Sequence, residues 1–163
     1  MKKITIDRYK SSKPLILANG DKYDSTLALI SEDGVILFYS ELVNTDHTNS
    51  YRGGILNEGG YYGIVGYRNN GNRVIKLFST GADITKIKTD KDINGCYMFL
   101  PSKVSNPNHN GKKIISYVQI HGGGLSWDYS HGCITLPNFS GFSEFDKLMK
   151  NINNNEILTV SLR

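Results

Sequence analysis

Short runs of alternating or consecutive apolar residues recur through most of the chain and predict strands. Each run is rich in β-branched or aromatic residues and is bounded by Gly, Asn, Asp or Pro. Seventeen glycines and ten tyrosines favour the same structure, strands joined by turns. The predicted strands cover residues 3–9, 26–30, 35–42, 60–67, 73–78, 97–100, 114–121, 133–136 and 157–162. Between the second and third, residues 31–34 predict a hairpin turn in which Asp33 and Gly34 adopt positive φ.

One stretch near the C-terminus has a helical pattern instead. Its apolar residues recur at helical intervals and form one stripe, which predicts an amphipathic helix over about 141–152. Ser140 or Ser143 can cap its start, and Glu144 lies in the first turn, where the helix dipole favours a carboxylate. The stripe consists of Phe142, Phe145, Leu148, Met149 and Ile152.

These elements predict a mainly β fold in a single domain that covers residues 1–163. We expect a sandwich or barrel of short, largely antiparallel strands with one amphipathic helix at the C-terminal end. The pattern does not alternate strands with helices, so a sheet built from βαβ units is not expected. No repeat and no linker divides the chain.

Length and composition exclude several classes of protein. With 163 residues and 39% hydrophobic residues, the chain can bury a core, which argues against wholesale disorder. No apolar run approaches the roughly 20 residues that cross a bilayer, so no membrane insertion is expected. The net charge is +4, but the basic residues are scattered and no basic stripe with interleaved aromatics predicts a nucleic-acid partner.

Reactive side chains gather within residues 118–137. This stretch holds two of the four histidines, one of the two cysteines and the single tryptophan. Alternation puts His121 on the strand face opposite Ile120, and in the following strand it puts Cys133 opposite Ile134. If the isoleucines face the core, His121 and Cys133 emerge together on the other side, from strands that form a hairpin or lie near one another.

A thiol beside an imidazole forms a nucleophile–base pair. The thiolate is the attacking species, and an adjacent His121 can take the proton of Cys133. Gly132 leaves room for the backbone to turn, so that the amides of Gly132 and Cys133 can hold a developing oxyanion. We expect His121 rather than His131 to be the base, because a carbonyl that accepts its Nδ1 proton can hold it at the end of a strand. His131, in the same turn as the thiol, is expected to shape the pocket.

Other roles for these residues stay open at this point. His121, His131 and Cys133 could ligate zinc with Asp128 as the fourth ligand, although the spacing is not a common zinc pattern. Cys133 could also form a disulfide with Cys96.

The remaining cysteine and histidines predict no chemistry. Cys96 precedes an apolar run and is expected to be buried and inert. His47 and His109 lie in polar, Asn-rich segments and are expected at the surface.

The motif around the cysteine resembles that of the L,D-transpeptidase (YkuD-type) family. That motif is a histidine, a spacer, then Ser/Thr-His-Gly-Cys, a hydrophobic residue, and Arg or Asn. A segment at residues 59–64 is similar to the Gly-x-Tyr-x-Ile strand found upstream in the family. The matching residues are His121, Gly122, Ser130, His131, Gly132, Cys133 and Ile134.

The resemblance implies acyl transfer on peptidoglycan stem peptides. Cys133 would attack the carbonyl before the terminal D-residue with His121 as base, and the thioester would pass to an amine or to water. The protein would thus be a transpeptidase, a carboxypeptidase or both, with no metal and no organic cofactor. The residues implied to bind substrate or to form the oxyanion hole are Gly132, His131, Ser130 and Gly122.

Two departures from the family pattern point to a compact branch. The spacer between His121 and Ser130 has eight residues, shorter than is usual, and Thr135 stands where Arg or Asn is expected. Both features are similar to type VI secretion effectors of the L,D-transpeptidase type, and a phage-encoded relative is the alternative. This branch implies a secretion apparatus or an immunity protein as further partners. The departures also leave an alternative, a non-catalytic cell-wall-binding or phage structural β-domain with the same fold.

The N-terminal residues bear on where the protein acts. Residues 1–8 are basic at the start but lack an apolar stretch, so we expect no secretory signal there. A substrate in the periplasm or cell wall would then require delivery by a dedicated apparatus, release by a phage, or earlier removal of a leader.

Overall fold

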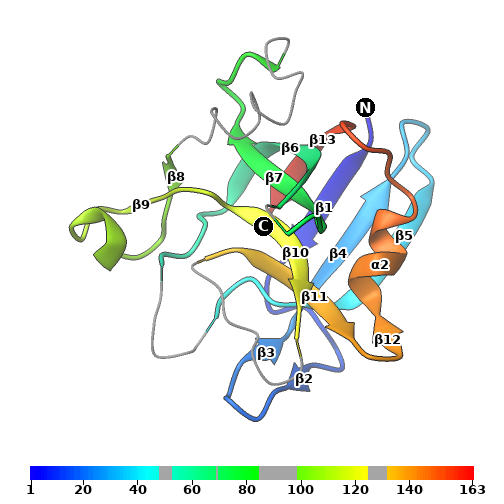
Figure 1. The fold of residues 1–163 in the computed structure, drawn as a ribbon, viewed down its shortest axis with the longest axis horizontal. Coiled ribbons are helices and arrows are strands. Elements are labelled where there is room, and N and C mark those ends of the chain that lie inside the picture. Colours follow the sequence, from blue (N-terminus) through cyan, green and yellow to red (C-terminus); the bar gives the residue numbers. More distant parts are fainter. Residues whose placement is uncertain (48–52, 69, 85–98, 125–131) are drawn as a thin grey trace.

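The fold is built on a mixed, curled β-sheet in a computed structural model that describes residues 1–47, 53–68, 70–84, 99–124 and 132–163 (Figure 1). Within these residues the sheet has nine strands, in the order β12-β11-β10-β7-β6-β13-β1-β4-β5. The strands are β1 (Lys3–Asp7), β4 (Ser25–Ile30), β5 (Ile36–Val43), β6 (Gly59–Tyr67), β7 (Arg73–Ser79), β10 (Gln119–Gly123), β11 (Ile134–Phe139), β12 (Phe142–Ser143) and β13 (Ile157–Leu162).

Smaller elements flank the sheet. Two ribbons pair β2 (Leu15–Ile16) with β3 (Lys22–Tyr23) and β8 (Leu100–Pro101) with β9 (Ile114–Ile115). A short 3-10 helix, η2, spans Pro107–His109, and the α-helix α2 spans Glu144–Met149. The expected mainly β architecture is therefore confirmed. Among the described residues, no helix has the length and apolar character needed to span a membrane.

Most neighbouring strands run antiparallel, as expected, but two pairs are parallel. These pairs are β1 with β13 and β10 with β11. Beyond its last strands the sheet curls back on itself, because Asn44, directly after β5, bridges Thr135 in β11. The segment that follows β5, the strand at one edge of the sheet, thus meets β11, which lies next to the other edge.

The core fills the inside of this curl. Alternate residues of β1, β4, β6, β7, β10, β11 and β13 point inward, which is the pattern of strands with one buried face. The helix α2 contacts β5, β10 and β11, so it closes the gap between the two ends of the sheet (Figure 1). Phe145, Leu148 and Met149 provide its buried face.

The predicted helix is shorter than its apolar stripe. Ser143 is the N-cap, and its Oγ accepts a hydrogen bond from the Asp146 amide at 3.0 Å. Phe142 lies before the cap in β12 and is partly exposed. Ile152 is buried just beyond the helix end. The predicted range 141–152 therefore contains a strand residue, a cap, six helical residues and a turn.

Two further sequence expectations need correction. Residues 114–121 do not form one strand, because Tyr117 has a φ of +56° and separates β9 from β10. The turn at residues 31–34 does form a hairpin, closed by the Gly34 amide on the Ser31 carbonyl at 3.0 Å. In that turn only Gly34 has positive φ, and Asp33 does not.

Candidate active site

Parallel pairing of β10 and β11 brings the predicted nucleophile and base onto neighbouring strands. Ile120 pairs with Ile134 and His121 pairs with Thr135, so Cys133 lies one residue before the strand, level with Gln119. Both isoleucines are in the core, and His121 and Cys133 belong to the opposite face. Diagonal neighbours in a sheet have Cα atoms about 7–8 Å apart, within reach of two side chains. The two strands are near neighbours, as expected, but they do not form a hairpin.

His121 is held in one orientation and one tautomer. Its Nδ1 lies 2.8 Å from the carbonyl oxygen of Gly122. A carbonyl can only accept, so Nδ1 carries the proton and the lone pair lies on Nε2. The carbonyl acceptor expected from the sequence is therefore confirmed. The side chain does not emerge into solvent, however, because His121 is only 3% exposed.

The surroundings of His121 keep its ring neutral at physiological pH. Burial, above all, and then the positive charge of Arg68 lower the pKa of His121 to about 4, and His47 adds a smaller effect in the same direction. The hydrogen bond to Gly122 acts in the opposite direction but does not outweigh these effects. A neutral imidazole with its lone pair on Nε2 can accept a proton.

Cys133 is a reduced, partly exposed thiol directly before β11. Its Sγ lies 3.7 Å from the carbonyl oxygen of Tyr117. Within the described residues, no hydrogen bond joins Sγ to His121, although the two side chains belong to the same face of the sheet.

The backbone before the thiol needs glycine. Gly132 has a φ of +104°, which side chains rarely adopt. A Cβ at this position would also lie 2.2 Å from Cδ1 of Ile115 and 2.7 Å from the Gly54 carbonyl oxygen. The sequence-based role of Gly132, room for the backbone to turn, is consistent with both observations. A Cβ on Gly122 would likewise lie 2.8 Å from Cβ of Asn138.

His47 is a site residue that the sequence analysis places wrongly. It is 3% exposed rather than at the surface. Its Nε2 donates to the Cys133 carbonyl oxygen at 3.0 Å, and its Nδ1 accepts from the Asn44 side-chain amide at 3.2 Å. Asp21 Oδ2 lies 3.7 Å from the same Nδ1. No local sequence signal reveals these contacts, because 86 residues separate His47 from Cys133.

The backbone of residues 44–47 is also hydrogen-bonded to β11. The Asn44 amide donates to the Thr135 carbonyl at 2.8 Å, and the Thr135 amide donates to the Asn44 carbonyl at 3.0 Å. Thr135 is fully buried in this bridge. Asn44 and His47 thus hold the chain on either side of Ile134.

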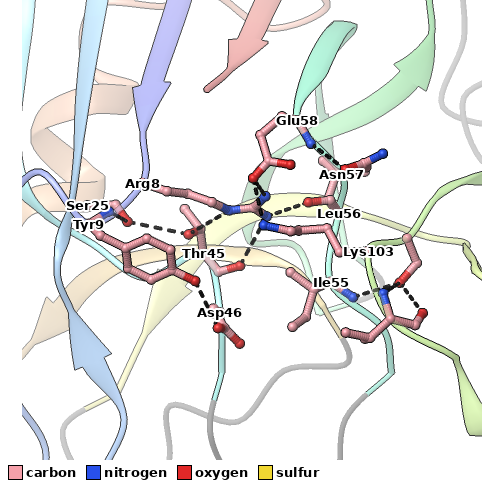
Figure 2. Close-up of polar contacts among 12 residues, drawn as sticks. Arg8, Tyr9, Ser25, Thr45, Asp46, Ile55, Leu56, Asn57, Glu58 and Lys103 are labelled. Atoms are coloured by element: carbon pink, nitrogen blue, oxygen red, sulfur yellow. Dashed lines mark hydrogen bonds and ion pairs between the residues drawn. The ribbon is translucent and has the colours of Figure 1, made fainter.

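A buried arginine anchors this segment to the rest of the sheet (Figure 2). Arg8, directly after β1, donates from Nε to Thr45 Oγ1 at 3.1 Å and from a terminal nitrogen to the Leu56 carbonyl. Its other terminal nitrogen lies 2.9 Å from Glu58, which Lys103 also contacts at 2.8 Å. The hydrogen bond from Lys103, with the added contribution of Arg8, lowers the pKa of Glu58 to about 2. This cluster ties residues 44–47 to residues 53–58, and so joins the two segments that contact the Gly132–Cys133 turn.

Several residues of the sequence hypothesis lie outside the described residues. They are Ser130, His131, Asp128 and Cys96. The zinc alternative therefore lies largely outside as well, and the described ranges contain no group of three metal-binding side chains. His109 is half-buried, with Nε2 3.1 Å from Ser116 Oγ and its ring edge-on to Phe99.

We compared the chain with known protein families, proteins and solved structures. No family model, no curated protein and no solved structure matches the chain.

Proposed function

We propose that this protein is a cysteine-dependent L,D-transpeptidase, L,D-carboxypeptidase or both, acting on the stem peptides of peptidoglycan. The observation that carries the proposal is the fixed tautomer of His121 on the strand next to Cys133. The hydrogen bond to the Gly122 carbonyl leaves the lone pair on Nε2, and strand alternation puts His121 and Cys133 on the same face of the sheet. The resemblance of the cysteine motif to the L,D-transpeptidase family supplies the substrate class.

The first half of the reaction forms a thioester. The Cys133 thiol gives its proton to Nε2 of His121, and the sulfur attacks the carbonyl that precedes the terminal D-residue. Backbone amides at the Gly132–Cys133 turn stabilise the oxyanion. The C–N bond then breaks, and the departing amine of the D-residue takes the proton from His121.

The second half releases the acyl group. His121 accepts a proton from the incoming nucleophile, which attacks the thioester carbonyl. The C–S bond then breaks, and the departing thiolate takes the proton from His121 to restore the thiol. Water as nucleophile gives a shortened stem peptide, whereas an amine gives a crosslink or an exchanged D-amino acid. Because the substrate lies in the periplasm or cell wall, the protein acts there.

Product analysis tests the proposal. We expect the wild-type protein, incubated with disaccharide-tetrapeptide, to release the terminal D-alanine or to form crosslinked dimers, detected by mass spectrometry. Cys133→Ala abolishes both products, and His121→Ala lowers the rate by roughly 10²- to 10⁴-fold, the usual effect of removing a general base. Cys96→Ala is the matched control and keeps the activity.

Two outcomes would contradict the proposal. Activity that a chelator removes and zinc restores would indicate a metal-dependent hydrolase. Equal sedimentation of wild type and Cys133→Ala with purified sacculi, with an unchanged muropeptide profile, would indicate the non-catalytic wall-binding domain. The observation that favours this non-catalytic function is the hydrogen bond from the Cys133 thiol to the Tyr117 carbonyl, at 3.7 Å.

A further inference from the structure

A pocket opens beside His121 at the end of β10, on the side of the β6–β7 hairpin. Its volume is about 570 Å³, which is within the usual range for small-molecule sites. His121 and Gly122 line it together with four charged residues from three segments of the fold. These residues are Arg68, Arg73, Asp146 and Lys150.

The basic side chains near this pocket differ in what they can offer a ligand. Arg73 donates to the carbonyls of Met149 and Ile152, at 3.1 and 2.7 Å, and so caps the end of α2. Lys76 in β7, which pairs with Gln119 of β10, is only 1% exposed. Lys150 is an exposed residue at the end of the helix. Arg68 is the basic residue that is both partly buried and fixed at the His121 side of the pocket.

Gln119 holds the Arg68 side chain over the face that carries the candidate nucleophile and base. Its Oε1 accepts a hydrogen bond from Nε of Arg68 at 3.0 Å. Gln119 is level with Cys133 in the register of β10 and β11. Arg68 is also close enough to His121 for its charge to affect that ring. Among the described residues, none bonds the two terminal nitrogens of Arg68, and these nitrogens form the fork that matches a carboxylate.

We propose that Arg68 binds a carboxylate of the donor stem peptide and so sets which peptides the enzyme acylates. This inference rests on the proposed function. A stem tetrapeptide has a C-terminal carboxylate one residue beyond the scissile bond. Where its third residue is diaminopimelate, it has a second carboxylate on that side chain. Arg68 lines the pocket with His121 and is hydrogen-bonded to Gln119, which is level with Cys133, so we infer that either carboxylate is held there while Cys133 attacks.

Binding to an inactive variant tests the inference without turnover. In full-length Cys133→Ala, calorimetry measures the affinity for three tetrapeptides. The first contains diaminopimelate and ends in D-alanine, the second ends in D-alanine amide, and the third has lysine in place of diaminopimelate. We expect one modified peptide to bind roughly 10- to 100-fold more weakly than the first, which is the usual effect of losing a charge-assisted hydrogen bond. The amide identifies the terminal carboxylate as the ligand, and the lysine peptide identifies the side-chain carboxylate.

Arg68 variants assign that preference to this residue. In the double variant that combines Cys133→Ala with Arg68→Met, we expect the first peptide to bind more weakly by the same factor. The three peptides then bind with equal affinity. Arg68→Lys keeps the charge but loses the two parallel donors of the guanidinium, so we expect an intermediate affinity for the first peptide. This variant also provides the test if Arg68→Met does not fold. Arg163→Met removes an exposed arginine that pairs with Asp7 away from the pocket, and it leaves all three affinities unchanged.

The outcomes separate the inference from the proposed function. Three equal affinities, or a preference that survives Arg68→Met and Arg68→Lys, would overturn the role of Arg68 alone. Absence of binding to every tetrapeptide would overturn the proposed function and the inference with it.

Discussion

The ring of His121 differs chemically from a histidine in water. It is almost fully buried, its Nδ1 proton is committed to the Gly122 carbonyl, and the Arg68 charge lies nearby. These features disfavour the imidazolium in the resting protein. In the proposed mechanism such a ring is a weak base towards the Cys133 thiol, but once protonated it readily passes the proton to a leaving amine.

A titration of the histidines tests this description of His121. We expect the His121 ring to stay neutral as the pH falls through 6.5 and to titrate near 4, because burial and Arg68 lower its pKa to about 4. The unfolded chain binds the proton more readily in this range. The free energy of unfolding therefore falls as the pH drops from about 6.5 towards about 4. NMR of histidine-labelled protein measures the midpoint, and the spectrum of His121→Gln assigns the signal.

Arg68→Met provides the internal control for this titration. Removing the positive charge raises the pKa of His121, so the midpoint moves to higher pH while burial still keeps it below 6.5. A midpoint at or above 6.5 in the wild-type protein would contradict the buried, neutral ring.

The sequence predicts contacts between neighbouring residues better than contacts between residues far apart in the chain. The Gly122 carbonyl is adjacent in sequence to His121, so a local argument could anticipate that contact. His47 lies among polar residues, and local composition placed it at the surface. Its burial comes from the Asn44–Thr135 bridge, a long-range contact that no local pattern encodes.

At the scale of elements, the segment directly after β5 supports the turn that carries the thiol. The L,D-transpeptidase pattern has Arg or Asn at the position where this chain has Thr135. In the structure, Asn44 bonds the backbone of Thr135 and His47 bonds the carbonyl of Cys133. We infer that these two residues position the turn, and that His47 acts through Cys133 rather than on the substrate.

Two substitutions of His47 separate positioning from folding. A glutamine can place its Nε2 where the histidine Nε2 donates, whereas an asparagine is too short. We expect His47→Asn to lower kcat by about 10-fold or more with little change in KM, because a misplaced nucleophile slows the chemical step. His47→Gln retains most of the activity. Steady-state kinetics on tetrapeptide measures both variants, and thermal unfolding checks that they are folded.

Equal kcat values for the two variants would contradict the positioning role. A parallel loss of kcat and of thermal stability in both would instead show that His47 serves only to fill the core.

Most individual elements were predictable, but their partners were not. Strands such as β6, β7 and β13 follow apolar patterns that set their bounds to within a residue. The parallel pairing of β10 with β11 depends on how the chain returns between them, which alternation does not specify. The ribbon of β2 and β3 has only two residues in each strand, too few for a recognisable period.

At the scale of the whole molecule, the candidate site is assembled from distant parts of the chain. Arg8 follows the first strand, and residues 44–47 and 53–58 come from the first half of the chain. Residues 119–122 and 132–135 come from the second half. The curl of the sheet brings these parts together, and α2 closes it. A mainly β fold with one helix could be read from composition and period, but the curl rests on long-range pairing that a single sequence does not reveal.

The central claim is that Cys133 forms a thioester with the stem peptide, and mass spectrometry of the quenched reaction tests it most directly. We expect the mass of the protein to rise by the mass of the tetrapeptide substrate less one molecule of D-alanine. Peptide mapping places the adduct on Cys133, neutral hydroxylamine removes it, and His121→Ala greatly slows its formation. Turnover by Cys133→Ala, or an adduct on any other residue, would contradict the account.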